Sequence, residues 1–475
     1  MAGDILRRWI LPAGTIVLVG VLGAAAIALR GSGPPPLLGP KPPETASAPP
    51  PSPPPEKEAP FTVLFGGECG GRLWSPPCSK FGLGGLERLA ALVRAGAGRP
   101  DAALALDTGD LAGAPGEAGA EEVGFGLKAL RIAGVHAAAV GERDLLAGLD
   151  RWRHRKNENG EGLAVLCANL RDDEGLPLVP GAAEFRFGKR RILVAAILSP
   201  SFEPGLRAAG VPVRLLPPVE ALRKDLAAAG PADLVVLLSH APPEESREIA
   251  KALPEVRLVI TAHAGPHPWL EPESVGGRTL MAPGSGWQYL ASALFLGKPG
   301  EGIDLLDART AAAGKSVIPE PGAGIVAEEA KFTWRQEGYL WRILEADAAR
   351  APEGAPAYAG PAACASCHPA AHAKWREEPH ARSAARLVKG NFDTVPLCLS
   401  CHATAPGRPG GHARPKDDQA SVSCEACHGP GKEHVAQDGR SPLPDAKASC
   451  GACHTPEMSP GFRYEDAWPR IVHGR

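Results

Sequence analysis

The sequence predicts a multidomain protein, in which an α/β domain precedes a smaller, mostly α-helical domain and an apolar helix stands at the N-terminus. Three observations predict this. An apolar run opens the chain, short apolar segments then alternate with helical patterns, and the last 125 residues hold few large aliphatic side chains. With 44% apolar residues the chain can fill two domains, and a net charge of −2 argues against nucleic acid as a partner.

The N-terminal segment, residues 1–30, is predicted to be a membrane anchor or a signal. Arg7 and Arg8 precede an apolar run from Trp9 to Leu29, whose length of about 21 residues is enough to cross a bilayer. Because no clean cleavage site follows, a retained anchor is preferred over a cleaved signal. The paired arginines favour the cytoplasmic side, so we expect the protein in the bacterial inner membrane with its bulk in the periplasm.

Composition then divides the remaining chain. Thirteen of the thirty residues from 31 to 60 are proline, which predicts an extended linker. We expect the α/β domain over 61–310, a second linker with a helix at Val326 to Arg350 over 311–357, and the final domain over 358–475.

The α/β pattern rests on apolar runs of strand length between amphipathic helical stretches. The predicted segments are Thr62–Phe65, Gly85–Ala95, Ala102–Asp107, Glu121–Ile132, Ala137–Val140, Leu163–Cys167, Arg191–Ile197, Val219–Ala229, Leu234–Leu238 and Leu258–Thr261. Alternation of this kind is typical of a sheet with parallel strands and helices between them.

The C-terminal segment cannot build an ordinary core. Only 12 of its 125 residues from 351 on are Leu, Ile, Val or Phe, a proportion found in chains that do not fold on their own. Four Cys-x-x-Cys-His motifs indicate what fills the gap: Cys364, Cys367 and His368; Cys398, Cys401 and His402; Cys424, Cys427 and His428; Cys450, Cys453 and His454. Each is a c-type haem attachment site, in which the thiols bind the porphyrin and the histidine binds iron. Zinc is the rival interpretation of paired cysteines.

Four covalently bound haems therefore need four sixth ligands. Five further histidines lie in the segment, namely His372, His380, His412, His434 and His473. This number favours two histidines per iron and low reduction potentials, since Met458 is the one methionine present.

The segment resembles the cytochrome c554-type tetrahaem family over 358–475, on the strings Tyr358-Ala-Gly-Pro-Ala-Ala-Cys364, Trp375 with Pro379-His380-Ala381, and Ser423 to Gly431 followed by His434. The resemblance implies that His380, His434 and His473 are distal ligands. One haem of the family can lack a sixth ligand, and here His412 stands in the corresponding loop. Whether one iron is open therefore stays undecided at this point.

Polar side chains follow four of the predicted strands. They are Asp107 with Asp110, Glu142 with Asp144, His240, and His263. Because the carboxyl ends of parallel strands meet at one edge of a sheet, these groups are predicted to converge there. Carboxylates and imidazoles in one place suit a divalent metal ion.

This series resembles the calcineurin-like metallophosphoesterases of the 5′-nucleotidase type, so the resemblance implies a metallophosphoesterase-like sandwich. It rests on Asp107-Thr-Gly-Asp110, Gly141-Glu-Arg-Asp144, Ser239-His240, Thr261-Ala-His263-Ala264 and Pro283-Gly-Ser-Gly286. One of the family's two metal positions is retained, with Asp110, Glu142, His240 and His263 as implied ligands of Mn, Zn or Fe.

The second metal position is lost in this resemblance, because the first strand runs into Gly66-Gly67-Glu68-Cys69-Gly70 and the last position is Gly265. Arg143 replaces the family's catalytic histidine, and it can balance phosphate charge but cannot carry a proton. If the domain is active, the catalytic candidates are Asp110, Arg143 and His240. Of the other cysteines, Cys69 and Cys78 are expected to form a disulfide, with a cysteine-based metal or redox site as the alternative, and Cys167 is expected to be buried.

Three functions remain open from the sequence. The first is a membrane-anchored tetrahaem cytochrome that transfers electrons, with the degenerate domain for binding or docking and with redox proteins or quinone-linked donors as partners. The second is a metal-dependent phosphoesterase coupled to a cytochrome. The third is a multihaem oxidoreductase that acts on a small molecule at an open haem.

Overall fold

The computed structural model describes residues 60–75, 78, 81–97, 103–149, 152, 162–298, 302–390, 392–412, 420–456 and 458–473. The predicted N-terminal helix over 1–30 and the linker up to residue 59 lie outside the described residues. Among the residues that are described, no helix is both long enough and apolar enough to span a membrane.

Two six-stranded sheets form the α/β part. The first has the order β14 (Gly302–Ala312), β13 (Tyr289–Lys298), β1 (Phe61–Gly66), β2 (Ala103–Asp107), β3 (Ala137–Ala139) and β4 (Ala164–Leu166). Strands β1 to β4 run parallel, whereas β13 and β14 form an antiparallel hairpin beside β1. The register places Asp107 beside Ala138, so β2 and β3 end at the same edge.

The second sheet has the order β11 (Glu273–Val275), β12 (Arg278–Met281), β10 (Leu258–Thr261), β9 (Leu234–His240), β7 (Arg190–Leu198) and β6 (Ala182–Phe187). Its central strands β7, β9, β10 and β12 are parallel. A short antiparallel pair, β5 (Leu170–Asp172) with β8 (Val213–Leu215), stands apart from both sheets.

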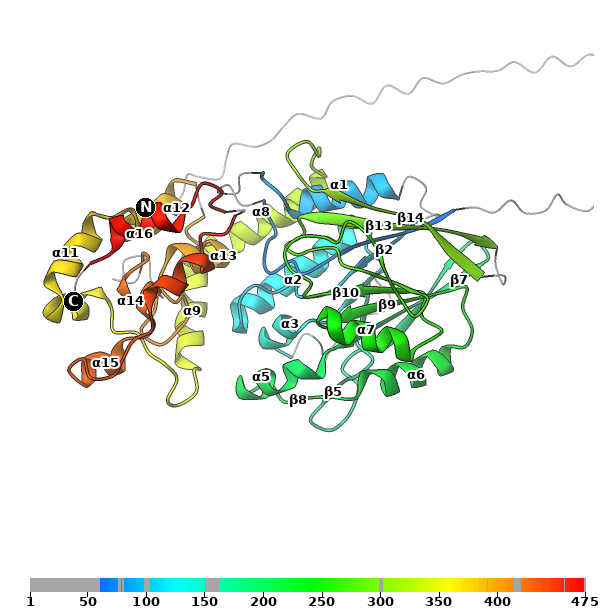
Figure 1. Cartoon of the computed structure of the whole chain (residues 1–475), viewed down its shortest axis with the longest axis horizontal. Helices are drawn as coiled ribbons and strands as arrows, with labels where there is room; N and C mark the ends of the chain where they lie inside the picture. The colour runs from blue at the N-terminus through cyan, green and yellow to red at the C-terminus, as the bar shows by residue number, and fades with distance from the viewer. Residues whose placement is uncertain are drawn as a thin grey trace, which may run out of the picture. The chain divides into compact units, whose positions relative to one another are not determined.

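The sheets pack face to face, and helices cover their outer faces (Figure 1). Side chains such as Phe65, Leu106 and Ile260 fill the space between the sheets. The outer face of the first sheet carries α1 (Leu86–Gly96) and α2 (Gly116–Ala133), and α8 (Pro321–Arg335) packs on these two helices. The outer face of the second sheet carries α6 (Pro218–Ala229) and α7 (Pro243–Ala252). The connections include α3 (Glu142–Leu146), η2 (Pro200–Phe202) and α5 (Glu203–Ala208). A central strand that is buried on both faces is continuously apolar, as β9 is from Leu234 to Leu238.

The α/β pattern predicted from the sequence is confirmed, while several elements were missed. The short strands β5, β6, β8, β11 and β12 and the hairpin of β13 and β14 had no clear sequence signal. The helix predicted from Val326 to Arg350 is two helices, α8 and α9 (Tyr339–Ala349), with the short turn η3 (Gln336–Gly338) between them. The break falls at Gly338, whose φ of 73° is a left-handed conformation that ends a regular helix.

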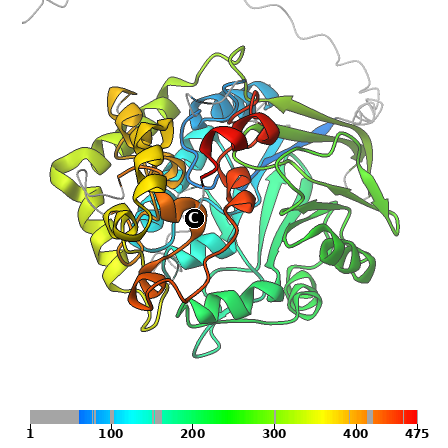
Figure 2. The same cartoon turned by 60° about the vertical axis from the view of Figure 1, so that its left-hand side comes forward.

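The C-terminal segment is built from short helices, drawn from yellow to red in Figure 2. They are α10 (Pro361–Cys367), α11 (Pro369–Glu377), η4 (Pro379–Arg382), α12 (Ser383–Gly390), α13 (Pro396–His402), α14 (Cys424–His428), α15 (Lys432–Ala436), η5 (Ala446–Ala452) and α16 (Tyr464–Ile471). From Pro379 on, the buried apolar side chains among the described residues are Leu387, Val395, Leu399, Ala403 and Ala446. So few cannot hold these helices together, which agrees with the composition.

Candidate functional site: a four-residue metal cluster and four Cys-x-x-Cys-His motifs

Four side chains converge at the carboxyl edges of the two sheets. Asp110 lies in the loop after β2, Glu142 begins α3 after β3, His240 ends β9, and His263 follows β10. One ligand atom from each lies within 4.8 Å of the others. The four residues that the sequence pointed to as ligands of one metal ion are therefore brought together.

The contacts within this cluster are close. The Nε2 atom of His240 lies 2.8 Å from Glu142 Oε2, 3.5 Å from Asp110 Oδ1 and 3.0 Å from His263 Nε2. His263 Nε2 in turn lies 3.3 Å from Glu142 Oε2. The two imidazole rings are nearly perpendicular, with centroids 4.7 Å apart. Two ring nitrogens and two carboxylates thus point at one small volume.

The tautomer of His240 is set by the hydrogen bond that its Nδ1 atom makes. Nδ1 lies 2.6 Å from the carbonyl oxygen of Thr108, so it carries the proton and donates to that oxygen. Nε2 therefore faces the cluster, where it donates to Glu142 when the ring is protonated and is available to a metal ion when it is not; this is the arrangement of a metal-binding histidine with a backbone partner behind it.

Backbone strain is concentrated at the cluster. Asp110 and His263 have φ values of 57° and 52°, which are uncommon for residues other than glycine. The buried carboxylate of Asp144 stabilises the loop of Asp110 by accepting backbone N–H bonds from Asp110 at 3.0 Å and from Leu111 at 2.7 Å. The hydrogen bonds to Asp144 therefore hold the loop in a strained conformation, and this conformation places the Asp110 side chain at the site.

Close backbone approach also demands a glycine before Glu142. A Cβ atom added at Gly141 would lie 2.1 Å from Asp110 Oδ1 and 2.7 Å from His240 Cε1. Only a residue without a side chain fits there.

The charges of the cluster balance one another. Burial alone would lower the pKa of His240, but the carboxylates of Asp110 and Glu142 outweigh it and raise this pKa to about 10. Burial would raise the pKa of Glu142, but hydrogen bonds from His240 and His263 hold it well below its usual range. The buried Oδ2 atom of Asp110 has no hydrogen-bond partner in the described part of the chain. Burial raises the pKa of Asp110 well above its usual range, so a cation bound beside this oxygen and the two imidazole nitrogens would stabilise the charged carboxylate.

Arg143 lies at the opening of the cluster. Its Nε atom is 3.4 Å from Asp110 Oδ2 and 3.9 Å from Glu142 Oε1, and its side chain is 54% exposed. The guanidinium can therefore meet an anion arriving from solvent.

Asp107 does not belong to the cluster. It is buried, and its carboxylate accepts hydrogen bonds from the Gly109 N–H and from Nε1 of Trp287, both at 2.9 Å. Burial raises its pKa to about 7. Asp107 thus supports the loop rather than offering a ligand.

Glu68 is a residue that the sequence reasoning passed over. It follows β1 with a φ of 50°, accepts a hydrogen bond from the His263 N–H at 3.2 Å, and lies 3.7 Å from His263 Nδ1. This carboxylate therefore fixes the backbone of His263 by a hydrogen bond and lies close to its ring without a hydrogen bond to Nδ1. Its position after the first strand was the available signal.

The disulfide expected between Cys69 and Cys78 is not formed, and this expectation was wrong. Neither Cys69 nor Cys78 takes part in a disulfide in the structure. Cys69 is buried, and burial together with Asp107 and Glu122 raises its pKa, whereas Cys78 is exposed and lies 3.7 Å from the sulfur of Met458. Cys167 is buried as expected.

The four Cys-x-x-Cys-His motifs lie on or beside short helices. The first ends α10, the second ends α13, the third forms α14, and the fourth overlaps η5. In the first motif, Cys364 lies close to Cys424 of the third, and in the second motif Cys401 lies close to Cys453 of the fourth. The motifs therefore approach one another in two pairs.

Two histidines of the segment are oriented by a hydrogen bond of their Nδ1 atom. The Nδ1 atom of His402 lies 3.0 Å from the Ser383 carbonyl, and that of His434 lies 2.6 Å from the Ser441 carbonyl. Each Nε2 is thereby left for an iron, and this second bond is the usual partner of a metal-binding imidazole. The residues present fit the haem that the motifs imply.

Two of the predicted distal histidines face a motif histidine. The ring centroids of His380 and His454 are 6.0 Å apart, and those of His428 and His473 are 5.9 Å apart. Bonds of about 2 Å from a metal to a nitrogen on each side would separate two imidazole centres by about 6 Å. Both centroid distances are close to this separation. His412, by contrast, is buried with its ring 5.3 Å from that of Trp341.

Glu425 is a further residue that the sequence analysis did not single out as functional. It lies inside the third motif, is 3% exposed, and accepts three backbone hydrogen bonds, from Ala359 and Gly360 at 2.8 Å and from Gly431 at 2.7 Å. Its carboxylate ties the start of the segment, just before the first motif, to the third motif.

Comparison with known proteins gives a likeness for each part of the chain. Residues 363–429, which include the first three Cys-x-x-Cys-His motifs, match the sequence family described as cytochrome c554 and c-prime. No curated protein sequence matches the chain.

The solved structures that match part of this chain include phosphoesterases and a sulfate thiohydrolase. A 5′-nucleotidase precursor from Thermus thermophilus has a TM-score of 0.47 and 19% identity, over 58% of this chain and 59% of its own. The sulfate thiohydrolase SoxB of Thermus thermophilus has the same TM-score and identity, over 59% and 61%. A calcineurin-like phosphoesterase from Bacillus subtilis has a TM-score of 0.45 and 13% identity, over 58% and 98%. This chain thus spans about three fifths of the two Thermus proteins. Its C-terminal segment is similar to the cytochrome c554 family, and the solved structures similar to its middle region are 5′-nucleotidases and calcineurin-like phosphoesterases.

Proposed function

We propose that the protein is a c-type cytochrome that carries four covalently bound haems and transfers electrons. The observation that carries the proposal is the pairing of His380 with His454 and of His428 with His473, beside motifs that attach haem. Two imidazoles facing each other at this distance suit a six-coordinate iron, which exchanges electrons and binds no substrate.

The residues of the chain hold and orient the groups. A bound haem supplies one-electron redox chemistry. The motif cysteines attach it, and His368, His402, His428 and His454 provide one axial nitrogen each. His380, His434 and His473 are proposed as distal ligands, with His412 as the fourth. The contacts between Cys364 and Cys424 and between Cys401 and Cys453 bring neighbouring attachment sites together, as a path for electrons requires.

The proposed setting is the periplasmic face of a bacterial inner membrane. It rests on the apolar run from Trp9 to Leu29 and on the export that c-type haem attachment needs. Redox proteins or quinone-linked membrane donors are the proposed partners, and nucleic acid is not.

The test is the count and the spin state of the haems in the full chain, produced with a haem-attachment system. We expect four covalent haems and low-spin spectra for six-coordinate iron. Fewer than four haems would overturn the proposal. A high-spin haem would instead support the third function, an oxidoreductase with an open iron, and His412 would then be the distal position to question.

For the α/β domain we propose a role in binding or docking, with one divalent metal ion of the Mn, Zn or Fe type. Asp110, Glu142, His240 and His263 form the one such cluster found among the described residues. The chemistry of a two-metal phosphoesterase needs a second ion a few ångströms away. Glu68, which follows the first strand, lies against His263 and is not part of the cluster.

A phosphoesterase that works with a single metal is the second candidate. The specific observation in its favour is Arg143, whose exposed guanidinium lies at the cluster and can balance the charge of a phosphate ester. The assay is hydrolysis of nucleotides and of a generic phosphomonoester by the full chain, with and without Mn²⁺ or Zn²⁺. Metal-dependent turnover that Asp110→Ala abolishes would establish this candidate, and no turnover would leave the binding role.

A further inference from the structure

Helix α9 connects the α/β part of the chain to the C-terminal segment. It precedes residues 363–429, which match the cytochrome c554 family. Its buried side chains Leu340 and Leu344 belong to the same apolar cluster as Leu130 of α2. At its end, Arg350 Nη2 lies 3.5 Å from Glu117 Oε2, also of α2. The helix is therefore fixed to the α/β part.

Helix α9 also packs on the loop that follows the second haem motif, residues 403–412. A Cβ atom added at Gly407 would lie 3.2 Å from Leu344 Cδ2 and 3.6 Å from Asp347 Cβ, so this loop runs against the helix. The indole ring of Trp341 lies beside the imidazole of His412, with ring centres 5.3 Å apart and planes at 75°. His412 is 1% exposed, so its ring is enclosed where the loop meets α9.

The backbone of His412 is held by the loop itself. Its N–H donates to the carbonyl oxygen of Thr404 at 2.8 Å, and its carbonyl oxygen accepts from the Gly407 N–H at 3.1 Å. Thr404 lies two residues after His402, the histidine of the second motif. These bonds fix the path of the loop but leave the two side-chain torsions of the histidine to be set by its neighbours. Trp341 is the aromatic neighbour of that ring.

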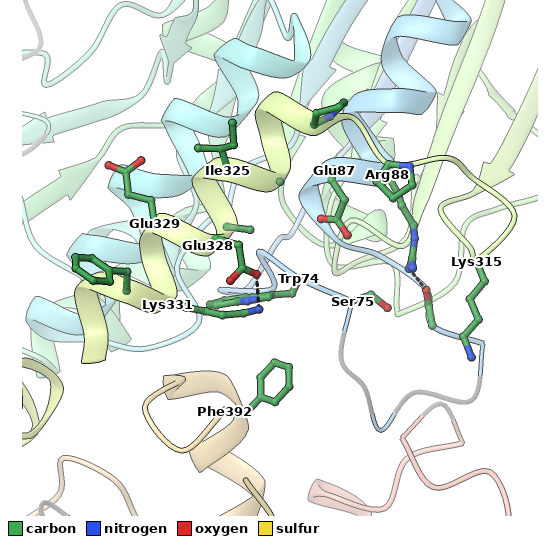
Figure 3. A pocket seen from close by; sticks show the side chains of 16 residues that line it. Trp74, Ser75, Glu87, Arg88, Lys315, Ile325, Glu328, Glu329, Lys331 and Phe392 are labelled. Carbon is green, nitrogen blue, oxygen red and sulfur yellow. Dashed lines mark hydrogen bonds and ion pairs between the residues drawn. The ribbon is translucent and has the colours of Figure 1, made fainter. Parts of the chain in front are cut away.

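The chain before the second motif rests on a neighbouring helix. Phe392 faces Trp74 and Lys331 across a pocket, as Figure 3 shows, and the Lys331 Nζ atom of α8 lies 5.2 Å from the Phe392 ring centre. Leu399, in the helix α13 of the motif, belongs to the same apolar cluster as Leu340 of α9. Helices α8 and α9 therefore contact the chain on both sides of the second motif.

We propose that Trp341 is a positioning residue for His412, and that α9 thereby makes the coordination of one haem depend on the α/β part of the chain. The inference rests on the proposed cytochrome function, in which His412 is the fourth distal ligand. An imidazole binds iron only when one of its nitrogens points along the open axial direction. An aromatic ring packed edge to face against that imidazole restricts its rotation and favours one orientation.

The experiment compares Trp341→Ala with the unaltered full chain, each carrying its haems. The readouts are the high-spin fraction of the oxidised protein and the CO bound by the reduced protein, because CO binds an iron whose sixth position is free. His412→Ala is the reference, and we expect it to open one haem of the four. Trp341→Ala should open the same haem in part, so the double variant should bind no more CO than His412→Ala alone.

Ile343→Ala is the matched control. Ile343 is buried on the same helix, two residues beyond Trp341 and so on nearly the opposite face. Its truncation weakens the packing of α9 but keeps the ring beside His412. We expect a lower unfolding temperature with all four haems still closed to CO, which separates a positioning role from a merely structural one.

The outcomes separate the two proposals. Fewer than four covalent haems in the unaltered chain would overturn the cytochrome proposal itself. Four haems with no gain in CO binding in His412→Ala or in Trp341→Ala would overturn only the present inference, and so would an equal gain in Trp341→Ala and Ile343→Ala. If Trp341→Ala fails to mature, Trp341→Leu takes its place in the same comparison, since leucine fills much of the space without an aromatic ring.

Discussion

His240 donates from Nδ1 to the carbonyl oxygen of Thr108 across 2.6 Å, and this bond turns its Nε2 toward Glu142. Thr108 belongs to the loop after β2, whereas His240 ends β9 in the other sheet. One hydrogen bond thus joins the two sheets and sets the orientation of a candidate metal ligand at the same time.

Removal of this imidazole should abolish metal binding by the α/β part. We expect the full chain to bind one equivalent of Mn²⁺, Zn²⁺ or Fe²⁺ besides its haem iron. His240→Ala should lower the affinity for this ion by more than about 100-fold, because the loss of a residue that only hydrogen-bonds to a metal ligand already costs about 10- to 100-fold. Elemental analysis after dialysis and calorimetric titration measure this. The control is His267→Ala, an exposed histidine four residues beyond His263 that is not in the cluster. Equal metal content in His240→Ala and the unaltered chain would contradict the assignment.

A simple geometric rule predicted that polar side chains would meet at one edge, because parallel strands present their carboxyl ends there. The resemblance to the metallophosphoesterases then implied which of them are ligands, namely Asp110, Glu142, His240 and His263. The rule gives no conformations, however. It could not show that Asp107 turns away to meet Trp287, or that Glu68 reaches back to His263, because both depend on positive φ values in loops.

The same limit holds in the C-terminal segment. Its motifs can be recognised from spacing alone, since covalent haem attachment needs a fixed local pattern. The facing of His380 and His454, 74 positions apart, depends on the path of the whole chain.

The missed hairpin of β13 and β14 has another cause. Its strand Gly302–Ala312 mixes charged, apolar and alanine residues, and such a strand has no clear alternation.

Gly141→Ala should destabilise the protein and weaken the metal site. The new Cβ would lie 2.1 Å from Asp110 Oδ1, so the loop must move, at a cost of about 1–3 kcal/mol for an overpacked site. Thermal and denaturant unfolding measure the change. Gly205→Ala is the matched control, because a Cβ there meets nothing within 4 Å and alanine favours the helix α5. A Gly141→Ala protein as stable as Gly205→Ala would show that the loop is not tightly packed.

Glu122→Gln should change how stability depends on pH. Burial raises the pKa of Glu122 to about 7, while its carboxylate accepts bonds from the N–H groups of Gly113 at 2.7 Å and Ala114 at 3.0 Å. An acid whose folded pKa is raised binds its proton more tightly in the folded state, so the free energy of unfolding falls as pH rises from about 4.5 to 7. A shift of this size corresponds to about 3 kcal/mol.

In the Glu122→Gln protein that part of the pH dependence disappears, because glutamine does not titrate. Denaturant unfolding at pH 5 and pH 8 gives the change in the free energy of unfolding between the two pH values for each protein. Comparing this change between the two proteins cancels the hydrogen bonds that the substitution weakens at both pH values. Glu117→Gln, an exposed position on the same helix, serves as the control. Parallel pH profiles for Glu122→Gln and the unaltered chain would refute the prediction.

Glu425→Ala should separate the first haem motif from the third. The carboxylate accepts three backbone N–H bonds, and each buried N–H left without an acceptor costs about 1–3 kcal/mol. Ala359 and Gly360 then lose their attachment to α14, and the close contact of Cys364 with Cys424 is expected to loosen. Circular dichroism in the Soret region reads the coupling between adjacent haems, and we expect it to weaken while all four haems remain attached. Glu433→Ala removes an exposed carboxylate eight residues later and should leave the signal as it was. An unchanged Soret signal in Glu425→Ala, together with unchanged thermal stability, would mean that haem packing alone keeps the two motifs together.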